Sequence, residues 1–254
     1  RQLYRWCAPT MSTIHMAAGA IAAGSGQAFI AGGVESMTRV PMGGFNPMPN
    51  PAMDKTDLGA YMSMGLTAEN VAKKYQITRE DQEKFAMASH QKAAKAWEDG
   101  KYDAEVTPVQ TNGHAVEKDG CIRPDTSLEA LAGLKPAFDA EGSVTAGTSS
   151  PLTDGATATL VTSEAYAKAN GLEILAKIKG MAVTGCDPEI MGIGPVPATQ
   201  KLLERHGLSI GDIDLFELNE AFASQSLAVQ RDLSIPDEKI NIDGGAIALG
   251  HPLG

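Results

Sequence analysis

The order strand, polar motif, helix occurs near both ends of the chain, and it restricts the possible folds more than any other feature. Leu3 to Ala23 and Leu215 to Leu233 each begin with a short apolar run and continue through a motif residue into a helix of small and apolar residues. Such units pack as helices on a sheet, so the chain is predicted to contain two similar α/β halves. The identity between the two segments is too weak to prove a repeat.

Helices are predicted from the spacing of apolar residues and from their end signals. Small and apolar residues at 3- and 4-residue spacings predict a buried helix over Ala8–Ala23, ended by Gly24. Thr78, with an acid three residues later at Asp81, is typical of the N-cap of a helix through Trp97. The predicted inner face of that helix is Ala86, Ser89, Ala93 and Ala96. Further helices are predicted at Ser163–Asn170, Pro197–His206 and Ala221–Leu233.

Strands and loops follow from other patterns. Gln27–Ala31 is a short apolar run suited to a covered strand, and alternating apolar and lysine residues predict a strand over Ile174–Thr184. A third strand is predicted at Leu215–Leu218. Periodicity disappears from Thr38 to Gly59, which indicates a boundary or long loop, and residues 101–148 are polar and rich in turns.

Charge and cysteine content exclude several classes of function. A formal net charge of −10 argues against nucleic acid or an anionic membrane surface as the main partner, and an anionic ligand would need a local basic patch. No apolar run approaches the roughly 20 residues of a membrane span. The scattered Cys7, Cys121 and Cys186 fit neither a metal site nor a secreted disulfide framework. They indicate reduced thiols in a cytosolic or organellar compartment.

The segment from Gly244 to Gly254 is dense in glycine and presents one histidine, His251. Glycines let a substrate and backbone amides approach a side chain closely, which acid/base or oxyanion chemistry requires. A loop histidine bound to a carbonyl is the alternative, and it is the more frequent one. Asn219 and Cys7, further up the chain, make His251 a better candidate.

Six segments in collinear order resemble the thiolase family, whose members are acyl-CoA acyltransferases that cleave or form 3-ketoacyl-CoA. The segments are Ala31–Met37, Met64–Asn70, Thr145–Gly155, Met191–Ala198, Asn219–Phe222 and Gly244–Gly254. The resemblance implies a layered α/β fold of two related lobes with an inserted loop domain. Because the chain starts at Arg1 and stops after Gly254, we expect a fragment that is incomplete at both termini.

The resemblance also implies a domain division. The expected domains are residues 1–37 with 153–172 for the N-terminal lobe, 38–152 for the loop domain with CoA-binding and oligomer contacts, and 173–254 for the C-terminal lobe. We expect a homodimer or homotetramer. A bacterial source predicts a cytoplasmic protein, and a eukaryotic source a mitochondrial or peroxisomal one.

Cys7 is the candidate nucleophile. The N-terminus of the predicted helix would lower the pKa of its thiol, although on sequence alone a buried cysteine is more often a small apolar residue. Arg5-Trp6-Cys7 resembles the nucleophile segment of the family, which favours the catalytic role. Tyr4, Pro9 and Thr10 depart from the family pattern, which places the access to Cys7, or its oxyanion geometry, in question.

Asn219 and His251 are the other candidate catalytic residues. The resemblance implies that they stabilise an enolate oxygen, His251 directly and Asn219 through a water, and that His251 helps to activate the nucleophile. Asn219 is also predicted to begin a helix as its N-cap. A second catalytic cysteine, in a Cys-x-Gly motif, is implied beyond Gly254, and neither Cys121 nor Cys186 matches it. We therefore predict that these 254 residues alone do not turn over.

Coenzyme A and acyl-CoA are the implied substrates, with no permanently bound cofactor and no metal. The residues that match the family's contacts to the pantetheine arm are Met64, Phe138, Ala146, Ser150, Met191 and Phe222. Each alone is more often a core residue than a ligand contact. Ser63 and the Thr148-Ser149-Ser150 segment favour a degradative 3-ketoacyl-CoA thiolase over a short-chain biosynthetic one.

Three alternatives remain open at this point. A condensing ketoacyl synthase shares the fold but would carry a histidine where Asn219 stands. A sterol-carrier type of thiolase-like protein would bind lipid or CoA without turnover, and an inactive partner subunit would serve assembly.

Overall fold

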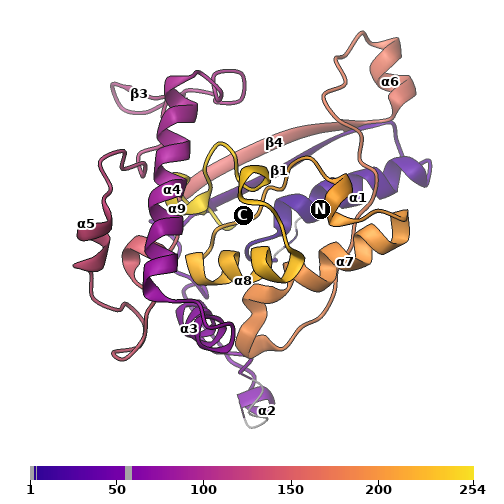
Figure 1. Ribbon diagram of the computed structural model, residues 1–254. Helices are drawn as coiled ribbons and strands as arrows, with labels where there is room; N and C mark the ends of the chain where they lie inside the picture. The colour runs from indigo at the N-terminus through magenta and orange to yellow at the C-terminus, as the bar shows by residue number, and fades with distance from the viewer. Residues whose placement is uncertain (1–2, 4, 55–58) are drawn as a thin grey trace. The chain divides into compact units, whose positions relative to one another are not determined.

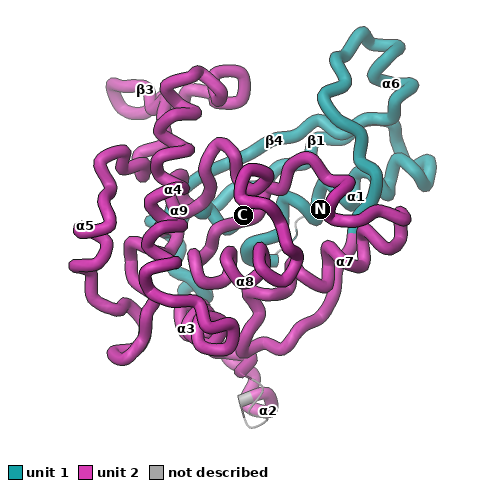
Figure 2. Tube along the Cα trace, viewed as in Figure 1, with its two compact units in different colours: residues 1–47, 152–181, 251–254 teal, residues 48–151, 182–250 magenta. Residues whose placement is uncertain are grey.

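The computed structural model describes residues 3, 5–54 and 59–254, so Tyr4 lies outside the described residues. The chain forms two compact units. Unit 1 contains residues 1–47, 152–181 and 251–254, and unit 2 contains residues 48–151 and 182–250 (Figure 2).

Unit 1 is built on one antiparallel strand pair. β1 (Ala28–Ser36) pairs with β4 (Asp154–Thr162) along its whole length, and α1 (Pro9–Ala22) packs against the pair (Figure 1). Its small core consists of Ala17, Ala31 and Val161, with Ile14, Ile21 and Phe29 partly buried around them. Because side chains alternate along a strand, the next residues face the other way. Ile30 and Val34 are 80% and 72% exposed. The pair therefore has one covered and one open face.

In unit 1 the helices and the strand lie where they were predicted, but the predicted burial of α1 and β1 is partly wrong. α1 lies within a residue of its predicted ends, but Met11 is 62% exposed, so the expected fully buried helix is wrong. β1 is longer than the predicted Gln27–Ala31 and has an open face, so it is not a covered strand. The short α6 (Glu164–Ala169) begins after Ser163, as predicted.

The predicted strand over Ile174–Thr184 is wrong. The described residues contain two strand pairs, β1 with β4 and β2 with β3, and residues 174–184 join neither. A strand needs a neighbour that satisfies its backbone amides and carbonyls, and alternation of side chains alone does not supply one. Leu175 is 88% exposed.

Unit 2 is mainly helical, and its longest helix is α4 (Arg79–Glu98). α3 (Met64–Lys74), α8 (Ala223–Leu233) and α9 (Ala246–Leu249) complete its centre, with α3 against α8 and both α8 and α9 against α4. The shorter elements are α2 (Pro51–Asp54), β2 (Val109–Gln110), β3 (Ala115–Val116), α5 (Leu128–Ala132), α7 (Pro195–His206), and the 3-10 helices η1 (Ala146–Thr148), η2 (Pro188–Ile193), η3 (Ile210–Asp212) and η4 (Asp237–Lys239).

The predictions for α4 are confirmed. The Asp81 amide donates a hydrogen bond of 3.1 Å to Thr78 Oγ1, which makes Thr78 the N-cap. The Asp81 carboxylate instead accepts from Arg231 on α8 at 2.8 Å, and that bond is the main cause that lowers its pKa. All four residues of the predicted inner face, Ala86, Ser89, Ala93 and Ala96, are buried.

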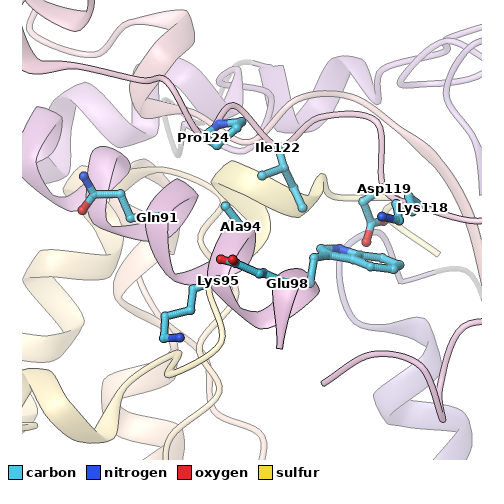
Figure 3. Close-up of a pocket in the computed structure, with 9 residues that line it drawn as sticks. Gln91, Ala94, Lys95, Glu98, Lys118, Asp119, Ile122 and Pro124 are labelled. Carbon is cyan, nitrogen blue, oxygen red and sulfur yellow. The ribbon is translucent and has the colours of Figure 1, made fainter. Parts of the chain in front are cut away.

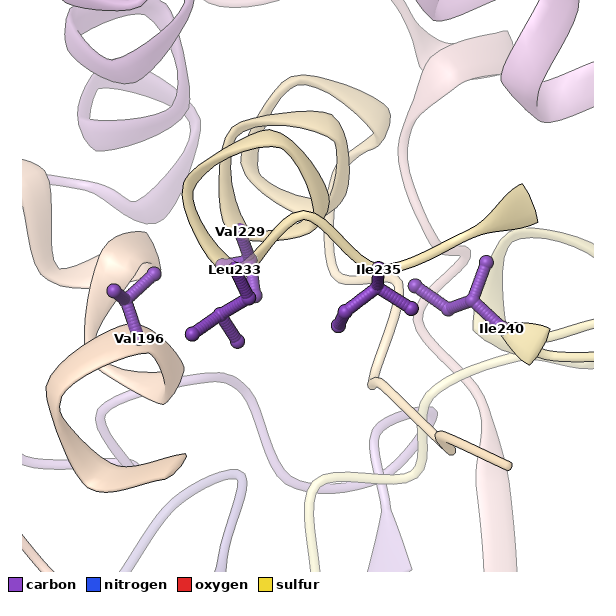
Figure 4. Close-up of a cluster of buried hydrophobic side chains, with 5 residues drawn as sticks. All are labelled: Val196, Val229, Leu233, Ile235 and Ile240. Carbon is purple, nitrogen blue, oxygen red and sulfur yellow. The ribbon is translucent and has the colours of Figure 1, made fainter. Parts of the chain in front are cut away.

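α8 supplies residues to every large apolar cluster of unit 2. Val229 and Leu233 pack with residues of α7 and of the 235–240 segment, as Figure 4 shows. Ala223 packs with Ala86 and Leu131, and Ala228 packs with Val71 and Ile190. The helix predicted over Ala221–Leu233 is therefore confirmed and central. The strand predicted before it reduces to one residue, Phe216, which forms an isolated parallel bridge with Ile240.

No helix among the described residues combines the length and the apolar character that crossing a membrane requires.

Replacing Leu233 with alanine is expected to lower the free energy of unfolding by about 2–5 kcal/mol, because the surrounding cluster cannot refill the cavity. The wild-type side chain is only 5% exposed. Leu215→Ala, at a side chain that is 54% exposed, is the matched control and should cost less than about 1 kcal/mol. Guanidinium unfolding measures both, and equal losses would contradict the assignment of this core.

His90 on α4 should make stability depend on pH. Its Nδ1 accepts a hydrogen bond of 3.1 Å from the Arg123 amide, and burial, followed by the charge of Arg123, lowers its pKa below 6.5. The unfolded chain therefore binds the proton first, so the contribution to stability is complete above pH 6.5 and shrinks as the pH falls.

The measurement is the free energy of unfolding between about pH 8 and pH 5. His90→Asn keeps an acceptor but does not titrate, so its stability should fall less steeply on the acid side, by at most about 1.4 kcal/mol per pH unit. Identical slopes in the two proteins would rule out His90 as a source.

Candidate active site

The glycine-rich segment is shaped by close backbone approach in unit 2. Gly244 has a φ of +86°, which favours glycine, and it lies so close to Ala93 of α4 that a Cβ would overlap it. A Cβ at Gly245 would overlap the carboxyl group of Glu220. These two glycines are therefore required by packing on α4 and on Glu220.

Glu220 is a buried carboxylate that the sequence analysis did not single out. Its side chain is 1% exposed, and it accepts hydrogen bonds from Ser89 Oγ at 2.6 Å, Asn241 Nδ2 at 2.8 Å and the Ile247 amide at 3.1 Å. Burial raises its pKa, and these hydrogen bonds act in the opposite direction. An acid directly after a candidate catalytic asparagine and directly before the apolar Ala221 and Phe222 was the signal that could have found it.

Asn219 lies in unit 2, immediately before Glu220, and is exposed. The prediction that it begins a helix as N-cap is wrong, because α8 starts at Ala223 and its N-cap is Phe222. The segment is held by side-chain hydrogen bonds instead, since the Asn241 side chain accepts from the Leu218 amide and donates to the Leu218 carbonyl, each at 2.8 Å. Asn219 thus sits between two anchored neighbours.

Cys7 lies in unit 1, directly before Ala8, the N-cap of α1, with Pro9 at the first helical position. The residue is exposed at its surface, yet enough protein surrounds the sulfur for burial to raise the pKa of the thiol. The expectation that the helix terminus lowers this pKa is therefore not met. The thiol form prevails at neutral pH.

His251 also lies in unit 1, where it forms a parallel bridge with Leu152. Burial lowers its pKa, so the imidazole is neutral at neutral pH. The Thr10 hydroxyl, three residues after Cys7, donates to the Gly254 carbonyl, three residues after His251. Thr10, which departs from the family pattern, therefore fastens the histidine segment to the first turn of α1.

All six residues predicted to bind coenzyme A lie in unit 2. The rings of Phe138 and Phe222 meet edge to face with 5.8 Å between centroids. The Ser150 amide and hydroxyl both donate to the Ala221 carbonyl, at 3.0 and 3.2 Å. Gly65, next to Met64, lies against the Phe138 ring.

The other two of the six are placed by 3-10 helices. Met191 lies in η2, which packs against α3 and α8, and it is 42% exposed. Ala146 begins η1 and is exposed. The structure therefore joins Phe138 and Phe222 through their rings and ties Ser150 to Ala221, the neighbour of Phe222, while Gly65, next to Met64, lies against Phe138.

Two cavities of unit 2, each of about 510 Å³, contain none of these six residues. One lies between α4 and the 118–124 segment and is lined by Trp97, Lys118 and Asp119 among others (Figure 3). The other lies beside Lys73 and Lys74 of α3 and the start of η2.

Comparison with known families covers nearly the whole chain. The family described as Thiolase, N-terminal domain matches residues 2–165, and that described as Thiolase, C-terminal domain matches residues 172–254. The 3-ketoacyl-CoA thiolase of Marinobacter nauticus is 53% identical over 98% of this chain and 66% of its own length. That of Aliivibrio fischeri is 52% identical over 98% and 67%.

Solved structures agree. The dimeric peroxisomal thiolase of Saccharomyces cerevisiae matches with a TM-score of 0.95 at 38% identity, over 99% of this chain and 66% of that one. Human mitochondrial 3-ketoacyl-CoA thiolase in complex with CoA matches with a TM-score of 0.89 at 39% identity, over 99% and 67%. The fold is an α/β fold of thiolase type, as predicted, and the chain belongs to the thiolase family. It spans about two thirds of the length of these relatives.

Gly245→Ala is expected to lower the free energy of unfolding by about 1–3 kcal/mol, because the new methyl group must displace the buried Glu220 carboxyl. Its backbone is not in the left-handed region, so the effect is one of space alone. Gly185→Ala, where nothing lies within 4 Å of the new Cβ, is the control and should cost far less. Chemical denaturation of both variants is the measurement, and a neutral Gly245→Ala would contradict the close packing.

Proposed function

We propose that the protein is an acyl-CoA acyltransferase that cleaves or forms 3-ketoacyl-CoA through an acyl group on Cys7, acting in fatty-acid degradation. The observation that carries the proposal is identity of 53% and 52% to two 3-ketoacyl-CoA thiolases over 98% of this chain. The catalytic set is Cys7, His251 and Asn219.

The chemistry fits the electrostatics of unit 1. The thiolate is the nucleophilic form of cysteine, and a Cys7 thiol of raised pKa needs a base. A neutral His251 can accept that proton. Attack of sulfur on the 3-keto carbon, followed by cleavage between the α and β carbons, leaves the acetyl-CoA enolate, whose oxygen His251 and Asn219 would stabilise. A proton from the implied second cysteine would convert the enolate to acetyl-CoA. The thiol of coenzyme A then takes the acyl group from Cys7, and its proton restores the cysteine thiol.

Coenzyme A is proposed to bind along the residues of unit 2 predicted for it, as a substrate and with no permanent cofactor. The support for these residues is the family resemblance, together with the ring contact between Phe138 and Phe222 and the hydrogen bonds from Ser150. A narrow, largely apolar path suits the flexible pantetheine arm. The human relative was solved in complex with CoA, which supports the same ligand here.

The domain division 1–37 with 153–172, 38–152 and 173–254 is retained as part of the proposal. A homodimer is proposed because one solved relative is described as dimeric, and a homotetramer remains the second possibility. The bacterial relatives support a cytoplasmic location, and the mitochondrial and peroxisomal ones support an organelle for a eukaryotic source.

The second candidate function is a thiolase-like lipid- or CoA-binding protein, or a partner subunit, without turnover. The raised pKa of Cys7 and the departures at Pro9 and Thr10 favour it. A ketoacyl synthase is disfavoured by the asparagine at position 219.

Incubation of the protein at its natural length with acetyl-CoA should add one acetyl group, located on Cys7 by peptide mapping. Cys7→Ser should abolish the labelling, whereas Cys121→Ser and Cys186→Ser should retain it, because only Cys7 precedes α1 in unit 1. Binding of acyl-CoA with Cys7 unmodified would instead support the non-catalytic alternative.

Residues 1–254 alone are expected to show no thiolysis of acetoacetyl-CoA, because none of their three cysteines stands in a Cys-x-Gly motif. Acetylation of Cys7 tests the first half of the reaction separately. Measurable turnover by a protein of only these residues would contradict the need for a second cysteine.

A further inference from the structure

We propose that Glu220 is the positioning residue that holds Asn219 and the backbone leading to His251 in their working geometry. The proposal rests on the proposed function, since Asn219 and His251 have a reaction to serve only if that function holds. The contacts of the Glu220 side chain do not depend on that function. The Glu220 carboxylate ties its own segment, which carries Asn219, to three other parts of unit 2.

The first step is that Glu220 joins segments distant in sequence. Ser89 belongs to α4, Asn241 follows the bridge of Phe216 with Ile240, and Ile247 belongs to α9. Ser89 Oγ also accepts from the Gly245 amide at 3.2 Å. The Glu220 side chain therefore links its own segment to the glycine-rich stretch that runs into His251.

The second step is that Asn219 is fixed from both sides. Leu218 is bound through its amide and carbonyl to Asn241, and the Glu220 side chain is anchored in the interior. Glu220 is buried whereas its neighbour Asn219 is exposed, so an inward Glu220 leaves Asn219 at the surface.

The third step is that only a carboxylate fits. Asn241 cannot rotate its amide, because its oxygen already accepts from the Leu218 amide and its nitrogen donates to the Leu218 carbonyl. Its second N–H faces Glu220 Oε1, and the Ile247 N–H faces Oε2.

A glutamine amide at position 220 would place its NH₂ against one of these two donors in either orientation. Glu220→Gln therefore keeps the volume of the side chain but creates a donor–donor conflict in the interior, which costs a buried polar group its partner. This makes the substitution a selective test of positioning.

The experiment uses the protein at its natural length and compares Glu220→Gln with Glu83→Gln. Glu83 is also a buried carboxylate of unit 2, 5% exposed, but it pairs with Arg79 within α4 and so joins no distant segments through that pair. We expect Glu220→Gln to lower kcat for thiolysis roughly 10- to 100-fold with little change in KM, since misplaced transition-state donors reduce kcat. Glu83→Gln should leave kcat unchanged even if its free energy of unfolding falls as much as that of Glu220→Gln.

Hydrogen exchange and a double-mutant cycle separate positioning from general destabilisation. The amide of Ile247 should exchange at least about tenfold faster in Glu220→Gln and not in Glu83→Gln. In an Asn219→Ala background, Glu220→Gln should reduce kcat by less than it does in the wild type, because the two residues act in one unit. Losses that multiply independently would overturn the proposal.

If Glu220→Gln does not fold, Ser89→Ala replaces it as the test variant. It removes one donor without a donor–donor conflict and should lower kcat about 3- to 10-fold, again with faster exchange at Ile247. Unchanged kcat and unchanged exchange in these variants would overturn the proposal. Absence of thiolysis in the wild type would instead refute the proposed function, and exchange at Ile247 would still decide whether Glu220 holds the segment.

Discussion

Three hydrogen-bond donors converge on a buried carboxyl group inside unit 2. Glu220 is 1% exposed, burial raises its pKa, and the three hydrogen bonds oppose that shift. The donors come from α4, from α9 and from Asn241, so the cost of burying the group falls only when all three parts are in place. Asn241 itself has a left-handed backbone, with a φ of +43°, a conformation that asparagine tolerates better than most residues. One interaction thus makes the central part of unit 2 cooperative, and it is the part that carries Asn219.

The helices could be predicted because their signals are local. The cap at Thr78 and the small residues on one side of α4 lie within one turn or one face of the helix that they specify. α8 was predicted as buried because nearly every position of it is apolar, small or neutral, and its residues enter three apolar clusters. Family membership was also predictable, since six short segments in order carry more information than any single motif.

The strands and the details of the site could not be predicted for a common physical reason. A strand exists only where another backbone pairs with it, so residues 174–184 had the right side chains without a neighbour in the described chain, and residues 215–218 pair only through the bridge at Phe216. Asn219 was predicted as a cap because it precedes α8, but the backbone turns into the helix only at Phe222. Glu220 was missed because its importance comes from residues 131 positions before it and 27 after it.

In unit 1, the position of Cys7 before a helix does not by itself make its thiol reactive. A cysteine before a helix is expected to favour the thiolate, but α1 begins with Ala8 and Pro9, and Pro9 has no amide hydrogen to offer the sulfur. Burial then dominates and raises the pKa of Cys7, while burial lowers that of His251. Both shifts favour the neutral forms, thiol and imidazole, over an ion pair. Under the proposed activity the charge on sulfur would form during attack rather than before it, and the donors that receive the developing enolate would have to supply the compensation.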